Sequence, residues 1–255
     1  MSATLKNCRV TILVKALPQP SKRYGETVCC AGVTPAGQWK RLFPIRFRHL
    51  AGDSSFVRWN WVQFQYKRPT TDVRAESCHV FEDSIRIDGK LARKQEQVRL
   101  LTPLILASAK EAALKGQSLA LIRPRNTRFI TKAKSKTDIE DEREAYRRAA
   151  RQTSLFDKEL AELEPSPYEF RFRFEDADGK HDYANGDWET HAMFWRESRR
   201  KDANEALRWM ASTFNEEYPR KGMVFAIGNQ AKRPQTWQLL GVLRLDESAQ
   251  GELRI

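Results

Sequence analysis

The sequence predicts an α+β protein with a mixed or barrel-like β-sheet core and inserted helices. Three observations indicate this class. Runs of β-branched and aromatic residues that alternate with polar ones dominate the chain, segments with helix-capping signals interrupt them, and the chain is large enough to bury a core. Its 255 residues are 40% hydrophobic and include seven Trp and thirteen Phe, which is typical of a globular protein.

The amino-terminal part reads as a series of strands. Residues 9–17 form an apolar run that ends before two prolines, which lack the backbone donor that a strand needs. Residues 27–34 and 38–45 are joined by a Pro-Ala-Gly turn at 35–37, so they predict a hairpin. Residues 59–66 (WNWVQFQY) indicate a further strand.

Mixed elements follow in the middle of the chain. Residues 80–91 contain two short strand-like runs around the turn dipeptide Asp88-Gly89. A helix is expected over residues 103–115, because Thr102 can cap it and a proline suits its first position.

A second, highly charged helix is expected to begin at a capping box formed by Thr137 and Glu140 and to extend through Arg151. After it, residues 168–175 (YEFRFRFE) alternate aromatic and charged side chains, which predicts a half-buried strand.

The carboxy-terminal part predicts two helices and two strands. One helix begins near Asp187, and the next begins at Asp202, which forms a capping box with Glu205. Residues 223–229 and 237–245 indicate the final strands.

An acidic stretch that ends at Pro165 and Pro167 predicts a seam in the chain. It separates a β-rich basic domain or subdomain, residues 1–155, from an α+β carboxy-terminal part, residues 167–255. The alternative is that the second part completes a single domain with the first.

The formal net charge of +12 favours a polyanionic partner, because Lys and Arg attract nucleic acid and release its counterions. The competing interpretation is a solvated basic surface with no such partner.

The four cysteines form no C-x-x-C pair, so they are expected to be buried free thiols rather than zinc ligands, and no metal is predicted. No apolar run approaches the roughly 20 residues of a membrane span, so no membrane partner is predicted. A cytoplasmic location fits both observations.

Basic and aromatic residues recur in two places, around the hairpin and in the basic run of residues 123–136. Arg side chains form forked contacts with phosphates, and exposed aromatic rings stack on bases. The predicted phosphate contacts are Lys22, Arg23, Arg41, Arg46, Arg48, Arg123, Arg125 and Arg128. The predicted stacking residues are Tyr24 and Trp39.

Catalytic candidates are weaker. His181 and Asp182 lie near a second group, Asp187, Glu189 and His191, and carboxylates beside imidazoles can serve acid–base chemistry. Asp187 and Glu189 also suit the first turn of a helix, where they would complement its dipole.

Glu26 is a further candidate base or base-edge acceptor, with an ion pair to Arg23 or Lys22 as the alternative. The chain has no phosphate-binding loop, dinucleotide fingerprint or nucleophile elbow, so no cofactor is predicted and enzymatic activity is not favoured.

Several phrases resemble an uncharacterised family of bacterial hypothetical proteins: PSKRYGETVCCAG, RLFPIRFR, YEFRFRFEDADGKHDYANGDWE and FAIGN followed by TWQLLGVL. That family brings no assigned activity. The expected architecture also resembles the PUA/ASCH/EVE class of small PUA-like barrels, which hold nucleotides or modified bases. The Gly-x-Lys-x-x-Glu-x-Arg signature of ASCH domains is absent from the chain.

These observations together predict a cytoplasmic bacterial protein that binds DNA or RNA through phosphate contacts, in a mobile-element or phage-defence setting. One alternative is a nuclease or base-processing enzyme. Another is an adaptor of a defence complex that binds a protein partner through residues 156–176.

Overall fold

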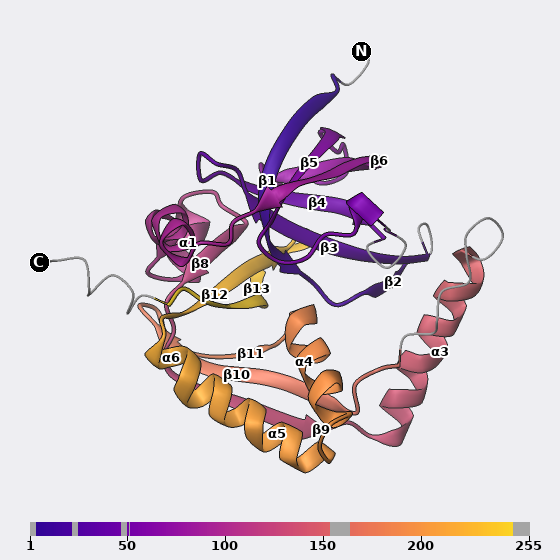
Figure 1. The fold of residues 1–255 in the computed structure, drawn as a ribbon, viewed down its shortest axis with the longest axis vertical. Helices are drawn as coiled ribbons and strands as arrows, with labels where there is room; N and C mark the ends of the chain where they lie inside the picture. The colour runs from indigo at the N-terminus through magenta and orange to yellow at the C-terminus, as the bar shows by residue number, and fades with distance from the viewer. Residues whose placement is uncertain (1–3, 22–24, 47–49, 51, 154–163, 247–255) are drawn as a thin grey trace, which may run out of the picture. The chain divides into compact units, whose positions relative to one another are not determined.

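The computed structural model describes residues 4–21, 25–46, 50, 52–153 and 164–246. The chain forms two compact units, labelled by element in Figure 1. Unit 1 contains residues 1–73, 77–90 and 133–168, and unit 2 contains residues 74–76, 91–132 and 169–255. The chain therefore alternates between the two units along its length.

Unit 1 is built on a closed barrel. Its strands are β1 (Lys6–Lys15), β3 (Gly25–Val33), β4 (Trp39–Ile45), β5 (Asn60–Lys67) and β6 (Ser77–Lys90). They lie in the order β1-β5-β6-β4-β3, and β3 pairs with β1 to close the ring. The β4–β6 pair is parallel and the other pairs are antiparallel. A short strand, β2 (Gln19–Ser21), pairs with the start of β3, and a 3-10 turn, η1, covers Gly52–Ser54.

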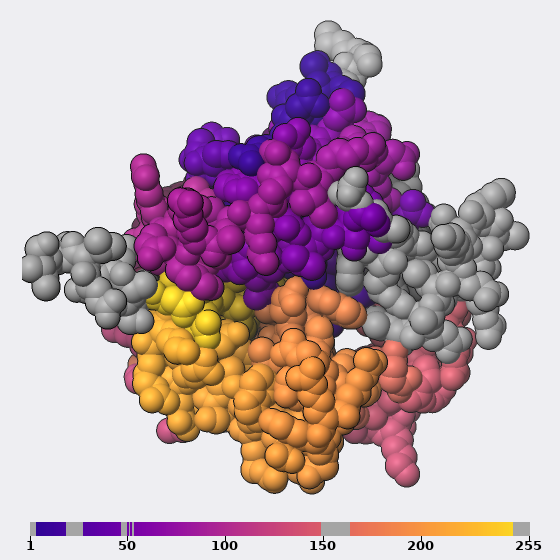
Figure 2. Space-filling view, viewed as in Figure 1, coloured from indigo at the N-terminus to yellow at the C-terminus, as the bar shows by residue number. Residues whose placement is uncertain are grey.

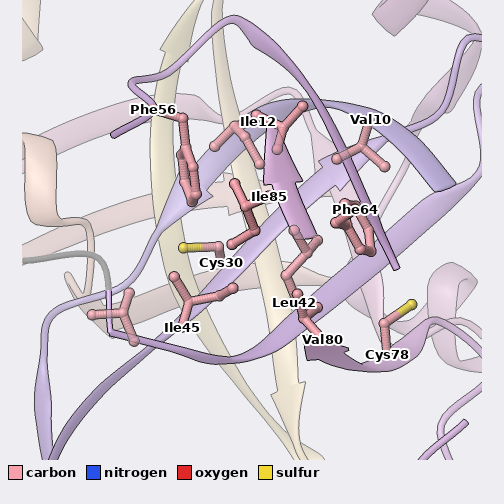
Figure 3. Packing of buried hydrophobic residues seen from close by; sticks show 12 residues of the cluster. Val10, Ile12, Cys30, Leu42, Ile45, Phe56, Phe64, Cys78, Val80 and Ile85 are labelled. Atoms are coloured by element: carbon pink, nitrogen blue, oxygen red, sulfur yellow. The ribbon is translucent and has the colours of Figure 1, made fainter. Parts of the chain in front are cut away.

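Apolar side chains from all five strands fill the barrel. Figure 3 shows them pointing into one another: Val10, Ile12, Cys30, Leu42, Ile45, Phe64, Val80 and Ile85, with Phe56 from the segment before β5. Each is at most 4% exposed. Side chains alternate along the regular parts of each strand, so the direct sequence neighbours of a core residue there face the outside of the barrel.

The predicted hairpin is confirmed. Thr34 and Gln38 are joined by a backbone hydrogen bond of 2.9 Å, and Gly37 takes the positive φ of 76° that the turn needs. The predicted turn at Asp88-Gly89 is wrong, because both residues lie within β6. The pairing of β6 with β5 continues to Lys90, so this dipeptide does not end the strand.

The charged helix is confirmed as α3 (Lys136–Thr153), but its cap lies two residues earlier than predicted. Ser135 Oγ accepts a hydrogen bond of 3.0 Å from the Asp138 backbone N–H, and the same hydroxyl donates to the Asp138 carboxylate. Ser135 and Asp138 thus form the cap that was assigned to Thr137 and Glu140.

Unit 2 contains two sheets and the remaining helices. Its strands are β7 (Ile105–Leu106), β8 (Leu119–Ile122), β9 (Arg125–Ala133), β10 (Tyr168–Asp176), β11 (Gly179–Ala184), β12 (Met223–Gln230) and β13 (Arg233–Arg244). One sheet has the order β13-β12-β8-β7 and the other the order β11-β10-β9. The helices are α1 (Lys94–Leu101), α2 (Ala109–Leu114), α4 (Trp188–Ser198), α5 (Ala203–Ser212) and α6 (Tyr218–Arg220), with a 3-10 turn at Thr102–Leu104 and a π turn at Thr213–Glu217.

The alternating strand β10 supplies one side of the core of unit 2. Phe170, Phe172 and Phe174 are at most 2% exposed, whereas the intervening Arg171 and Arg173 lie on the other face. The alternation predicted from the sequence is therefore confirmed. With a barrel in unit 1 and sheets and helices in unit 2, the predicted α+β class and barrel-like core are also confirmed.

Two of the predicted helix starts are confirmed and one is wrong. Asp187 and Asp202 cap α4 and α5. The helix expected from residue 103 begins later, because Ser108 caps α2 by accepting a 3.1 Å hydrogen bond from the Glu111 N–H. The residues before it extend as β7, which pairs with β8. Within the described ranges, none of these helices combines the length and apolar character that crossing a membrane requires.

Candidate nucleic-acid interface

Two exposed phenylalanines lie on the outside of the barrel. Leu42 of β4 and Val80 of β6 point into its core. Their sequence neighbours Phe43, His79 and Phe81 therefore point outward. Phe43 and Phe81 are each 40% exposed, which is unusual for rings of this size in a sheet. Figure 2 shows the barrel segments, coloured indigo to magenta, forming part of the outer surface.

Strand pairing brings these rings together with a cation. Phe43 lies beside His79 in the parallel β4–β6 pair, and His79 lies opposite Lys67 of β5. The rings of His79 and Phe81 meet edge to face with centres 6.0 Å apart, and the Lys67 ammonium lies 5.8 Å from the centre of the Phe81 ring. We call Phe43, Lys67, His79 and Phe81 the aromatic surface.

The chemistry of the aromatic surface suits an unpaired base and its phosphate. Stacking of a base on an exposed aromatic side chain contributes roughly 1–3 kcal/mol and does not depend strongly on which base it is. An ammonium group beside the ring can contact the phosphate of the stacked nucleotide. The aromatic surface therefore combines the two interactions on which binding of single strands depends.

A hollow of about 570 Å³ lies over β1, β5 and β6. It is lined by Asn7, Cys8, Arg9, Gln63, Phe64, Gln65, Ser84 and Arg86. The hollow coincides with a bulge, because Gln63 pairs with Arg86 and Gln65 with Phe81, which leaves residues 82–85 of β6 opposite a single residue of β5. At this bulge the Ser84 hydroxyl accepts a 2.8 Å hydrogen bond from the Gln65 backbone N–H.

An ion-pair network borders this hollow. The Arg9 guanidinium lies 2.5 Å from the Asp88 carboxylate and 4.5 Å from the centre of the Trp61 ring. The Gln63 side-chain amide donates a 2.9 Å hydrogen bond to the same carboxylate. Hydrogen bonds from Gln63 and Arg9 lower the pKa of Asp88, because both favour the ionised carboxylate.

The site residues predicted around the hairpin have different outcomes. Lys22, Arg23, Tyr24 and Arg48 lie outside the described residues. Trp39 is 7% and Arg41 4% exposed, so neither presents its side chain to solvent. The Arg46 guanidinium is paired with the Glu82 carboxylate at 2.9 Å.

The second predicted group lies in unit 2. Arg123, Arg125 and Arg128 are exposed, and Arg125 also donates a 3.0 Å hydrogen bond to the backbone carbonyl of Asp176. The hairpin residues belong to unit 1, so neither unit alone brings the two predicted groups together.

The catalytic candidates near α4 have structural partners. Asp187 is 1% exposed, and its carboxylate accepts hydrogen bonds from the backbone N–H groups of Glu189 and Val242, at 3.2 and 3.0 Å. Glu189 lies in the first turn of α4, and the His191 ring packs 4.8 Å from the ring of Phe170. Asp187 therefore joins a helix start to a strand. Glu26, the remaining candidate, lies on β3 opposite Pro20.

His181 has a different environment. Its Nε2 lies 2.8 Å from Oδ1 of Asp176, whose side chain is 1% exposed. No described residue hydrogen-bonds to the other oxygen of this buried carboxylate. His181 lines a hollow of about 360 Å³ together with Arg173, Lys180 and other polar residues. Across the residues that the structure describes, no group of three His, Cys, Asp or Glu side chains is placed to hold a metal ion.

Sequence reasoning missed every member of the aromatic surface. Phe43 follows the apolar Leu42, and Phe81 follows the apolar Val80, so neither stands out from its strand. The alternation of buried and outward residues in 78–81 could have placed His79 and Phe81 on one face. The pairing of that face with β4 and β5 required the structure.

Comparisons with known proteins identify two family models. One, described as Domain of unknown function (DUF8758), matches residues 6–103, and the other, described as Domain of unknown function (DUF8757), matches residues 102–254. Both agree with the resemblance to an uncharacterised family. No curated protein matches the chain. Among solved structures, one similar chain comes from a replication protein A heterotrimer bound to ssDNA. The two sequences are 12% identical, and the alignment covers 99% of this chain and 68% of that chain, with a TM-score of 0.26. A TM-score this low does not establish a shared fold.

Proposed function

Since the chain belongs to the family described as Domain of unknown function (DUF8757), we propose its function from its own residues: it binds single-stranded nucleic acid on the outside of its barrel. The observation that carries this proposal is the pair of Phe43 and Phe81, each 40% exposed and grouped with His79 and Lys67. Aromatic rings that keep 40% of their surface exposed can stack on unpaired bases, and a neighbouring cation can contact the phosphate of the stacked nucleotide.

Charge supports a polyanionic partner. The chain has a net charge of +12, which strengthens the encounter with nucleic acid at low salt. Lys67 belongs to the aromatic surface, and the exposed Arg68 directly follows it, with one guanidinium nitrogen donating a 3.1 Å hydrogen bond to the backbone carbonyl of Val73. We therefore propose Lys67 and Arg68 as phosphate contacts, in place of the buried Arg41 and the paired Arg46.

Architecture offers a further argument, by analogy. OB-fold proteins are five-stranded barrels that bind oligonucleotides on the face of their second and third strands. Among the barrel strands of this chain, β3 and β4 are the second and third, and Phe43 lies on β4. A shared architecture alone does not fix a function, so the side chains carry the argument. The likeness to PUA-type barrels, the bacterial origin and the phage-defence setting stay predictions of the sequence.

Fluorescence anisotropy with labelled oligonucleotides tests the proposal. We expect binding of single-stranded DNA or RNA at low salt, weaker binding of a blunt duplex of the same length, and an affinity that falls as salt rises. No binding at low salt, or a preference for the duplex, would refute the proposal.

Two substitutions locate the binding surface. Phe43→Ala and Phe81→Ala should each lower the affinity by the equivalent of about 1–3 kcal/mol, because each removes a stacking ring. Phe81→Trp should retain binding. Val73→Ala is the matched control, because Val73 is an apolar residue of unit 1 that is 86% exposed and lies outside the aromatic surface. Equal affinities for all four variants would place the interface elsewhere.

The pair of His181 and Asp176 supports a second candidate, the nuclease or base-processing enzyme. A buried carboxylate that holds one nitrogen of an imidazole leaves the other nitrogen available as a general base. Incubation of labelled single strands, in parallel reactions with added Mg²⁺ and with a chelator, tests it. Cleavage or base conversion that His181→Ala abolishes would support this candidate, and no turnover by the unsubstituted protein would eliminate it.

A further inference from the structure

Two side-chain amides lie directly beside the aromatic surface. Asn7 of β1 and Gln65 of β5 are paired across the two strands, and Gln65 is paired with Phe81 on its other side. Their neighbours Cys8 and Phe64 pack toward the barrel core, so both amides point outward. The outer face thus presents an unbroken row of Asn7, Gln65 and Phe81, perpendicular to the strands.

Other polar groups of the adjoining hollow are already engaged. Gln63 donates to Asp88, and Arg9 is held by the same carboxylate. One nitrogen of Arg86 donates to the backbone carbonyls of Asp83 and Ile85, at 2.9 and 2.7 Å. These contacts fix the walls of the hollow.

The amides of Asn7 and Gln65 differ from these groups. Between described residues, neither side-chain amide takes part in a hydrogen bond, although both line the hollow of about 570 Å³. Cross-strand neighbours have Cβ atoms about 5 Å apart, close enough for both side chains to contact one planar ligand. A hollow of this size lies within the range of small-ligand sites.

We propose that Asn7 and Gln65 bind the edge of one adenine of a bound single strand. Another base of the same strand stacks on Phe81. A side-chain amide presents a donor and an acceptor side by side, which matches the amino group N6 and the ring nitrogen N7 of adenine. This inference rests on the proposed function and adds base preference to it. The aromatic surface supplies affinity for any base, and the two amides select one.

Competition among homopolymers tests the preference. We expect oligodeoxyadenosine to bind about tenfold more tightly, equivalent to about 1.4 kcal/mol, than the same oligomer of 7-deaza-2′-deoxyadenosine, which stacks similarly but lacks the N7 acceptor. The double variant Asn7→Ala/Gln65→Ala should lose this difference while keeping its affinity for oligothymidine. Gln95→Ala, an exposed amide on α1, is the matched control and should retain the difference.

The outcomes separate the two proposals. Binding of all homopolymers with equal affinity, by the unsubstituted protein and the double variant alike, overturns the base preference and leaves the proposed function standing. An equal loss of affinity for every homopolymer in the double variant also overturns it, because the amides would then hold the strand without reading the base. Failure of every homopolymer to bind overturns the proposed function and this inference with it.

Discussion

The Lys67 ammonium lies 5.8 Å from the centre of the Phe81 ring, across two adjacent antiparallel strands of the barrel. The strands fix both side chains at their Cα atoms, so the spacing between cation and ring does not depend on a loop. A base stacked on Phe81 would place its phosphate within reach of this ammonium. Stacking and charge neutralisation can therefore act on the same nucleotide.

Replacement of Lys67 should change the salt dependence of binding. Lys67→Gln removes one phosphate contact, so the slope of the logarithm of affinity against the logarithm of salt concentration should become shallower by about 0.7. Lys67→Arg should keep the slope. Anisotropy titrations at several salt concentrations measure it, and Lys132→Gln, an exposed lysine of unit 2, is the control. A slope unchanged in Lys67→Gln would exclude this lysine as a phosphate contact.

Local patterns in the sequence predicted local structure well. The alternation that buries Phe170 and Phe172 needs only the two-residue period of a strand. The caps at Asp187 and Asp202 need only a side-chain oxygen placed before a helical run. The cap at Ser108 was missed because Thr102 and the following proline gave an equally good local signal, and the pairing of β7 with β8 decided between them.

The candidate site could not be predicted in the same way. Phe43, Lys67 and His79 meet only because β4 pairs with β6 in parallel and β6 pairs with β5 antiparallel. The register between strands that lie far apart in the sequence is set by tertiary packing, so the residue pattern of one strand does not predict it. Charge alone pointed to Arg41 and Arg46, but one is buried and the other is paired with Glu82.

Gly32→Ala should destabilise the barrel. Gly32 of β3 pairs with Ile12 of β1, where the barrel closes, and a Cβ at this position would lie 2.3 Å from the backbone oxygen of Thr11. Backbone atoms cannot move aside as a flexible side chain can, so we expect a loss of about 1–3 kcal/mol in the free energy of unfolding.

Urea unfolding followed by tryptophan fluorescence measures this loss. Gly52→Ala is the control, because Gly52 has a positive φ of 55° but no atom within 4 Å of an added Cβ. That substitution carries only the backbone strain, about 1 kcal/mol. Unfolding midpoints that are equal for Gly32→Ala and the unsubstituted protein would contradict the observed closure of the barrel.

Asp187 should contribute to stability rather than to catalysis. Asp187→Ala removes the cap of α4 and leaves the buried Val242 N–H without its acceptor, so we expect a loss of about 2–4 kcal/mol. Asp187→Asn retains an acceptor oxygen and should lose less. Asp202→Ala removes an exposed cap alone and should cost about 1 kcal/mol. Thermal unfolding measures the order of stability among these three variants. If Asp187→Asn kept full stability but lost an activity of the protein, Asp187 would instead have a catalytic role.

The thiol of Cys78 should be unreactive in the folded protein. Burial raises its pKa to about 12, so at pH 8 its thiolate fraction is on the order of a thousandfold below that of an ordinary cysteine. Burial raises the pKa of Cys30 as well. Iodoacetamide labelling with mass spectrometry should therefore leave both thiols unmodified at pH 8 and modify them in urea. Below the pKa of a thiol, its thiolate fraction rises tenfold with each pH unit. A slow labelling rate that also rises tenfold per pH unit would therefore show that the reagent reacts with the buried thiol of the folded protein. Labelling of Cys78 at the same rate in the folded and unfolded chain would show that the barrel core is open to solvent.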